Sequence, residues 1–147
     1  METGNDRAGR GARPRAATRP AATARTMTVT GGALYPFVPS GPDFRLAMNF
    51  FAALGFTPKW ESAGYAGLQF GAAFFILQEY VSREWAENQM VVYEVSDLEA
   101  YYAQLLALDL PVKFAGVRVN PPKDFPWGRE IHLTDPAGVC WHVRQMA

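Results

Sequence analysis

Apolar and polar positions repeat in two similar blocks along this chain. Residues 43–56 (DFRLAMNFFAALGF) and residues 97–110 (DLEAYYAQLLALDL) align without a gap at an offset of 54. Each block begins with an aspartate, which favours the N-cap of a helix, and continues for about three turns with apolar residues at helical spacing. The pattern therefore predicts two helices at equivalent positions of an internal repeat.

Short strand-like segments surround each predicted helix and are bounded by turn residues. The first helix lies among residues 33–38, 57–62, 65–70 and 72–78, and the second lies among residues 89–95, 111–117, 129–134 and 139–144. This order predicts two βαβββ modules, at about residues 32–80 and 88–145. Each module can cover only one sheet face with its helix. The sequence therefore predicts an α+β fold in which the modules pair into a curved, cup-like mixed sheet with the helices on its outer face.

The polarity of the last two predicted strands specifies their pairing. A turn centred on Ala137 places these residues opposite each other: Glu130 and Arg144, His132 and His142, Thr134 and Cys140, Ile131 and Val143, Leu133 and Trp141. The first three pairs share a polar face, and the other two share an apolar face. A slip of one residue would mix the faces. We therefore expect the apolar face to pack toward the helices and Glu130, His132 and His142 to line the cup.

Composition limits the class of protein. The chain has 147 residues, of which 49% are hydrophobic, and a single cysteine, Cys140. These values favour one domain with a real core, and they exclude an internal disulfide framework or a thiolate zinc cluster within one chain. The longest apolar run, residues 72–77, is much shorter than the roughly 20 residues of a membrane-spanning helix. We expect a soluble cytoplasmic protein with no membrane partner.

Charge divides the chain into two parts. Residues 1–27 form an Arg/Ala-rich segment with six arginines, two acidic residues and no apolar periodicity, so we expect a disordered tail. The tail is either an inert segment or translation artefact upstream of a natural start at Met27, or a transit peptide or nucleic-acid arm. Residues 28–147, the predicted domain, contain eight basic and twelve acidic residues, a net charge of −4. This charge favours cationic ligands and disfavours nucleic acid.

Three features together resemble a known superfamily. They are the paired βαβββ modules, the FFAALGF sequence at residues 50–56 and the sequence PWGREIHLTDPAGVCWHV at residues 126–143. They resemble the glyoxalase/bleomycin-resistance/extradiol-dioxygenase (vicinal oxygen chelate) superfamily over roughly residues 32–145, and bleomycin-resistance proteins most of all. The resemblance implies an antibiotic-resistance protein that sequesters a planar cationic drug without a cofactor. It also implies a homodimer with ligand grooves between its subunits.

The resemblance also implies which residues bind the ligand. Trp60 and Tyr65 align with groove-lining aromatic residues of bleomycin-resistance proteins, and Trp127 lies in the matching PWG. Aromatic rings hold planar cations by stacking and by cation–π contact. The predicted ligand-binding set is Trp60, Tyr65, Trp127, Glu130, His132 and His142. Val92 stands where bleomycin binders tend to carry tryptophan, so the identity of the ligand stays open.

We predict a binding protein rather than an enzyme, with no catalytic residues. Metalloenzymes of this superfamily take ligands from the first and last strands of each module. Here the first strands offer Tyr35 or Pro36 and Met90. The last strands offer Gln78 or Glu79 and His142. Few of these suit a hard divalent ion, and the chain lacks GxSxG and P-loop motifs. The alternative is a metal-dependent lyase or dioxygenase whose zinc, nickel, manganese or iron is held by residues among His132, His142, Glu130 and Glu79.

Overall fold

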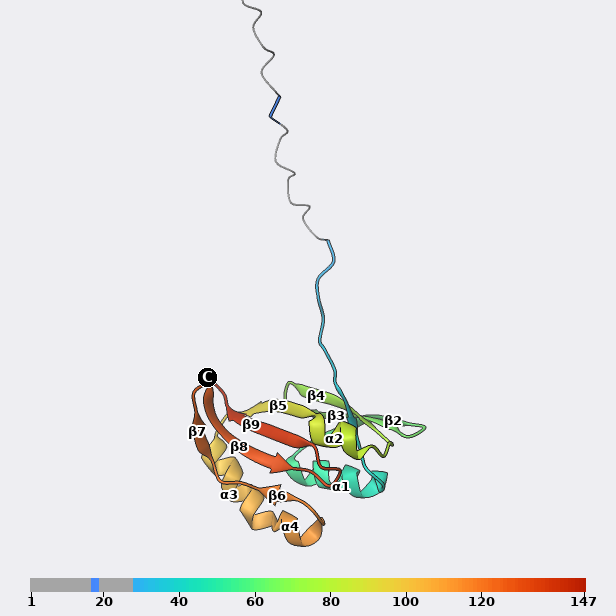
Figure 1. Ribbon diagram of the computed structural model, residues 1–147, viewed down its shortest axis with the longest axis vertical. Coiled ribbons are helices and arrows are strands. Elements are labelled where there is room, and N and C mark those ends of the chain that lie inside the picture. The colour runs from blue at the N-terminus through green and yellow to red at the C-terminus, as the bar shows by residue number, and fades with distance from the viewer. Residues whose placement is uncertain (1–16, 19–27) are drawn as a thin grey trace, which may run out of the picture. The chain divides into compact units, whose positions relative to one another are not determined.

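The computed structural model describes residues 17–18 and 28–147, so nearly all of the predicted tail lies outside the described residues. Residues 33–147 form a unit with a single hydrophobic core (Figure 1). Its elements are β1 (Phe37–Pro39), α1 (Phe44–Leu54), β2 (Thr57–Ser62), β3 (Tyr65–Phe70), β4 (Ala73–Gln78), α2 (Arg83–Asn88), β5 (Met90–Val95), α3 (Leu98–Leu108), α4 (Leu110–Lys113), β6 (Arg118–Val119), β7 (Lys123–Phe125), β8 (Gly128–Thr134) and β9 (Cys140–Gln145).

The two predicted helices begin with the expected caps. The Asp43 side chain accepts a hydrogen bond from the Leu46 backbone N–H at 2.9 Å, and Asp97 accepts one from Ala100 at 3.0 Å. Each cap satisfies a backbone donor that a helix start leaves free. Helix α1 ends at Gly55, whose φ of 111° is a left-handed conformation that glycine adopts without strain. The equivalent helices α1 and α3 are both 11 residues long, as the repeat predicts.

Each module forms its own mixed sheet, which confirms the α+β class and the paired βαβββ modules. The strand order is β1-β4-β3-β2 in the first sheet and β5-β9-β8-β6 in the second, where β7 also pairs with β8. In both sheets the first strand of the module runs parallel to the last strand, and the other pairs are antiparallel. Figure 1 shows α3 and α4 beside the second sheet.

The predicted register of β8 and β9 is confirmed for all five pairs, from Glu130 opposite Arg144 to Thr134 opposite Cys140. The apolar members of these strands lie in the core and are at most 1% exposed: Ile131, Leu133, Trp141 and Val143. The polar members therefore project from the other face of the sheet, since neighbouring side chains of a strand point in opposite directions.

Helix α1 packs against the inner faces of both sheets. The Phe51 ring on α1 lies 4.8 Å from the Phe75 ring on β4 and 5.2 Å from the Trp141 ring on β9, measured between centroids. All three side chains are nearly or fully buried. Because both sheets turn their apolar faces to this shared core, no helix or strand among the described residues of the chain covers their opposite faces.

One predicted strand is wrong. Residues 111–117 begin with the short helix α4, not with a strand. Asp109 takes a left-handed conformation with φ of 52°, which redirects the chain and lets Leu110 reach the core. Pro111 then stands in the first helical turn, where its missing N–H loses no hydrogen bond. The first predicted strand, residues 33–38, is also shorter than expected, and strand β7 was not predicted.

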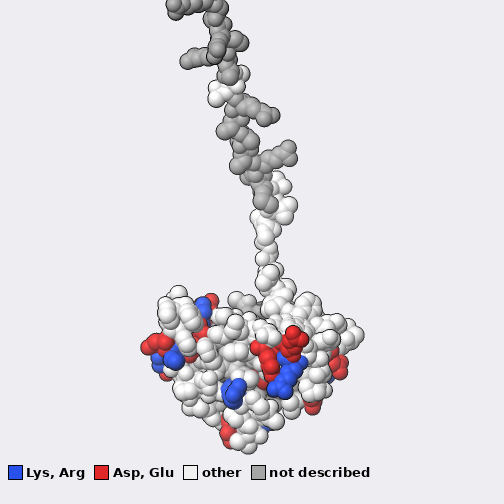
Figure 2. Space-filling view, in the orientation of Figure 1, with Lys and Arg blue, Asp and Glu red and all other residues white. Residues whose placement is uncertain are grey.

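The helices of the described residues are short, and the charge on one face of the molecule is mixed. No helix among the described residues is both long and apolar enough to cross a bilayer. Figure 2 shows basic and acidic side chains interspersed on one face of the molecule, without a broad basic patch there.

Candidate functional site

The uncovered side of the first sheet carries a group of aromatic rings, which we call the aromatic face. It consists of Tyr35, Phe37, Trp60, Tyr65 and Phe74. The Tyr35 and Phe74 rings lie 4.5 Å apart, and the Phe37 and Tyr65 rings lie 6.2 Å apart edge to face. All except Phe74 are more than a third exposed. A contiguous exposed aromatic surface of this kind is typical of a ligand or protein interface.

A glycine makes room for the largest ring of the aromatic face. A register shift between Pro58 and Trp60 places Trp60 opposite Gly67 on β3. A Cβ atom at Gly67 would overlap the Trp60 indole and would lie 2.6 Å from the Phe74 ring. The missing side chain lets Trp60 lie close over the sheet, and the Trp60 residue stays 42% exposed.

The uncovered side of the second sheet carries a line of rings, which we call the ring column. Its members are Trp127, Phe125, His132 and His142. Trp127 and Phe125 are stacked, with centroids 5.2 Å apart and planes 13° apart, and Phe125 stacks on His132 at 4.8 Å and 17°. His132 lies 4.2 Å from His142 in a tilted arrangement. The column begins at Trp127, in the turn between β7 and β8. Trp127 as a residue is 58% exposed.

One carboxylate, that of Glu130, is hydrogen-bonded to three members of the column. Glu130 Oε1 accepts hydrogen bonds from the Arg144 guanidinium, at 2.8 Å, and from the Trp127 indole. Its Oε2 bonds His142 Nδ1 at 2.7 Å and His132 Nε2 at 3.2 Å. Burial opposes ionisation of this carboxyl group, but the hydrogen bonds outweigh it and lower the pKa of Glu130 to about 2. The Glu130 side chain is fully buried, so its ion pair with Arg144 is not a solvent-exposed surface pair.

Two cavities lie near these faces. A cavity of about 230 Å³ opens beside the ring column and is lined by Asn120, Pro121, Lys123, Phe125, Glu130 and His132. A larger cavity of about 650 Å³ lies between the β3–β4 turn, β5 and the start of α3. The larger one contains none of the predicted ligand-binding residues. We therefore place the candidate site at the two uncovered faces and the small cavity, where the aromatic and polar groups gather.

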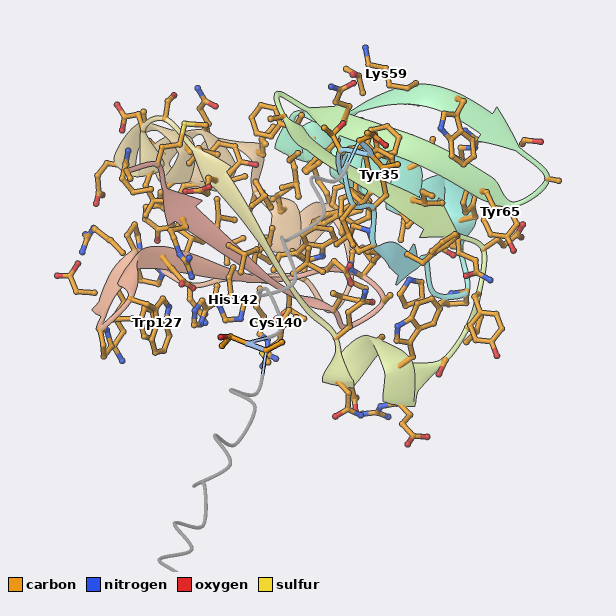
Figure 3. All side chains as sticks on the ribbon, turned by 90° about the horizontal axis from the view of Figure 1, so that it is seen from above. Tyr35, Lys59, Tyr65, Trp127, Cys140 and His142 are labelled. Carbon is orange, nitrogen blue, oxygen red and sulfur yellow. The ribbon has the colours of Figure 1, made fainter. Side chains whose placement is uncertain are left out.

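The structure separates the predicted ligand-binding residues into two groups. Trp60 and Tyr65 lie on the aromatic face of the first sheet, whereas Glu130 and the two histidines lie with Trp127 on the second. Figure 3 shows Tyr65 on one side of the view, with Trp127 and His142 on the other. One chain therefore brings four of the six residues together, and it does not bring the three predicted aromatic residues into one clamp.

Three residues of the second group could hold a metal ion. Donor atoms of Glu130, His132 and His142 all lie within 4.8 Å of one another, and two imidazoles with one carboxylate suit zinc, iron or nickel. His142 Nε2 is buried without a hydrogen-bond partner among the described residues. Arg144 bonds the same carboxylate and would repel a cation there. Glu79 follows β4 in the first sheet, where its N–H donates to Gly64, and it is not part of this group.

Sequence reasoning missed several residues of these faces. Phe125 lies in the middle of the ring column, and its only signal was its place one residue before the PWG sequence. Tyr35 and Phe74 complete the aromatic face. Phe74 immediately precedes the core residue Phe75 on β4, so its side chain points to the opposite face of the sheet. An aromatic residue at an outward position of a strand was the available signal. Cys140, at the start of β9, is half-buried, and burial raises the pKa of its thiol, which does not favour a nucleophile.

Comparison with solved structures identifies the fold. A bleomycin-binding protein in complex with bleomycin is similar to this chain with a TM-score of 0.68 and 24% identity, over 80% of this chain and 100% of that one. The bleomycin-binding protein of Streptomyces verticillus, in complex with copper(II)-bleomycin, has a TM-score of 0.67 and 20% identity, over 82% and 100% of the two chains.

A fosfomycin resistance protein has the same architecture. FosX from Listeria monocytogenes, with Mn(II) and sulfate, has a TM-score of 0.62 and 13% identity over 81% of this chain and 93% of that one. No protein-family model matches the sequence, and no curated protein matches it. The resemblance found in the sequence is thus confirmed at the level of architecture: the chain has the vicinal oxygen chelate fold, in the form seen in the bleomycin-binding proteins.

Proposed function

We propose that this protein binds a planar, cationic, drug-like small molecule of the bleomycin type and sequesters it without a protein-bound metal or other cofactor. The observation that carries the proposal is the presence of two uncovered surfaces rich in aromatic rings, the aromatic face and the ring column. Stacking contributes about 0.5–1.5 kcal/mol per ring pair beyond buried area, so several rings give a useful affinity. A cytoplasmic place of action, expected from the single cysteine, belongs to this proposal.

A homodimer completes the binding site in this proposal. Trp60 and Trp127 lie on different sheets of one chain, and both sheets turn these residues away from the shared core. If two copies pair so that the aromatic face of one is opposite the ring column of the other, each groove acquires rings on both sides. The symmetric pairing gives two such grooves per dimer. The bleomycin complexes of two proteins with this fold support a ligand of this class.

Electrostatics supports a cationic ligand. The folded part of the chain carries a net charge of −4, which raises the local concentration of cations. Within the ring column, the positive charge of Arg144 is matched by the negative charge of Glu130, so this pair does not repel such a ligand. The rings then supply cation–π contact and stacking.

Titration of tryptophan fluorescence with metal-free bleomycin tests the proposal. We expect quenching on binding, and we expect Trp127→Ala to weaken affinity by about 1–3 kcal/mol, the range of a buried aromatic anchor. A metal chelator added to the titration should leave the affinity unchanged. If wild-type protein shows no saturable quenching, or if chelator abolishes it, the proposal fails. If Trp127→Ala binds normally but melts several degrees earlier, Trp127 is a structural residue.

A second candidate is a metal-dependent lyase or dioxygenase. The observation that favours it is the approach of Glu130, His132 and His142, a donor set with two nitrogens and one oxygen. A metal ion there would replace the hydrogen bonds between the histidines and Glu130. It could act as a Lewis acid on a bound oxygen ligand. Elemental analysis of purified protein separates the candidates, because stoichiometric zinc, nickel, manganese or iron would favour the enzyme.

A further inference from the structure

We propose that Glu130 is a positioning residue. Its carboxylate holds the ring column in one arrangement, so that the free side of Trp127 is presented to a planar ligand in a single orientation. The part of this inference that concerns the ligand rests on the proposed function. The positioning itself is a property of the free protein and can be measured without a ligand.

The first observation is the contrast in exposure between the two bonded residues. Trp127 lies in a turn and is 58% exposed, whereas Glu130 is 1% exposed, yet the indole N–H of Trp127 donates to the Glu130 carboxylate. An exposed side chain in a turn ordinarily moves among its rotamers. A hydrogen bond to an ionised acceptor is roughly twice as strong as one between neutral groups. The exposed ring is therefore tethered to a rigid, buried point of the sheet.

The second observation is that the carboxylate itself has no freedom to turn. Arg144 and His142 reach it from β9, His132 reaches it from its own strand β8, and Trp127 reaches it from the preceding turn. Rotation of the carboxylate would break bonds to two strands at once. Phe125 adds a geometric restraint, because its ring lies nearly parallel to that of Trp127. The orientation of Trp127 is therefore set by the hydrogen bond from its indole N–H to Glu130 and by the Phe125 ring stacked on one of its sides.

These contacts distinguish positioning from direct binding. Both oxygens of Glu130 already accept hydrogen bonds and its side chain is fully buried, so its hydrogen-bonding capacity is used within the protein even though it borders the small cavity. The free side of Trp127 is the part that extends the stack. A planar ligand stacked on that side would extend the ring column beyond Trp127, at the end opposite His142. Holding the ring in place beforehand removes an ordering cost of about 0.5–1.5 kcal/mol for such a side chain.

The wild-type protein provides the first test. The Nε1–H resonance of Trp127, assigned by its loss in Trp127→Phe, should exchange with water much more slowly than the same group in N-acetyltryptophanamide. A side chain that is merely exposed in a turn would exchange at the rate of the free indole. Exchange at that rate would overturn the proposal, whatever ligand the protein binds.

Binding provides the second test. Glu130→Met removes the carboxylate that Trp127, His132, His142 and Arg144 share while keeping similar bulk, and Trp127→Phe keeps a ring but removes the N–H. Both should weaken the affinity for metal-free bleomycin by about 2- to 12-fold, the equivalent of the ordering cost. The matched control is Glu99→Met, since Glu99 bonds Arg129 at 2.8 Å and is not bonded to the column. It should bind as the wild type does.

The outcomes separate this inference from the proposed function. If wild-type protein does not bind bleomycin, the proposed function fails, and slow exchange of the Trp127 N–H still establishes positioning. If wild-type protein binds and both Glu130→Met and Trp127→Phe bind equally tightly, Glu130 does not position the ring for the ligand. Should Glu130→Met fail to fold, the wild-type exchange rate and Trp127→Phe decide the question.

Discussion

Trp60 lies directly over Gly67 on the neighbouring strand, and no other residue type at position 67 would leave that space. A Cβ atom there would overlap the Trp60 indole and would also approach the Phe74 ring to 2.6 Å. The contact is between an outward side chain and bare backbone, on the side of the sheet away from the core. The glycine therefore shapes the aromatic face rather than the core.

Gly67→Ala should displace the Trp60 ring and weaken ligand affinity by about 1 kcal/mol or more. The change in near-ultraviolet circular dichroism and the affinity for bleomycin measure the two effects. In a double-mutant cycle with Trp60→Ala, the two substitutions should be strongly non-additive, because the glycine acts through the tryptophan. Fully additive losses would show that Gly67 acts in some other way.

Mixing two binding-deficient variants tests the proposed groove between the subunits of a homodimer. Trp60→Ala and Trp127→Ala should each bind weakly alone. After subunit exchange, a mixed dimer has one groove without either tryptophan and one groove with both. Equal mixing should therefore restore tight binding in about one quarter of the grooves. Isothermal titration measures that fraction, and a mixture that stays as weak as its components would contradict a shared groove.

Acid should reveal the contribution of Glu130 to stability. The pKa of this group in the folded protein is about 2, below its ordinary value of 4.5, because of hydrogen bonds from Arg144, His142, Trp127 and His132 that outweigh burial. The stabilisation is complete above pH 4.5 and is lost as the pH falls through about 2. A shift of this size corresponds to about 3 kcal/mol.

Urea unfolding of wild-type protein and Glu130→Gln between pH 2 and pH 6 measures this contribution. The difference in unfolding free energy between the two proteins should shrink as the pH falls. A difference that stays constant over the range would show that the ionisation of Glu130 is not coupled to folding.

Asp135 should be a strong determinant of the β8–β9 turn. Its Oδ1 accepts hydrogen bonds from the backbone N–H groups of Ala137, Gly138 and Val139, and its Oδ2 accepts one from the Trp141 indole at 2.9 Å. Asp135→Asn would point an amide N–H₂ at one of these donors. We expect a loss of about 1–3 kcal/mol in unfolding free energy, the cost of an unsatisfied buried polar group.

Thermal unfolding of Asp135→Asn, with the exposed Asp124→Asn as its control, measures that loss. Asp124 bonds only the exposed Arg129 side chain, at 3.0 Å, so its replacement should change stability little. Equal melting temperatures for Asp135→Asn and the wild type would show that the turn does not depend on this carboxylate.

Local sequence patterns were sufficient to predict the elements whose polar and apolar residues repeat regularly. The register of β8 and β9 followed from alternation together with the turn centred on Ala137, because a slip of one residue would move Trp141 to the polar side. The starts of α1 and α3 followed from Asp43 and Asp97, which act on donors only three residues away. The strand predicted at residues 111–117 was wrong because the left-handed turn at Asp109 and the burial of Leu110 depend on packing that local pattern does not contain.

The sequence by itself determined that one face of the β8–β9 hairpin is polar and that the chain contains two βαβββ modules. Only the tertiary structure decided that Trp60 and Trp127 belong to different surfaces and that Glu130 is buried beneath the rings it bonds. The physical reason is the position of Phe51, which contacts Phe75 of one sheet and Trp141 of the other. Because both apolar faces meet at this one helix, the aromatic face and the ring column lie on the sides of the two sheets that face away from the shared core.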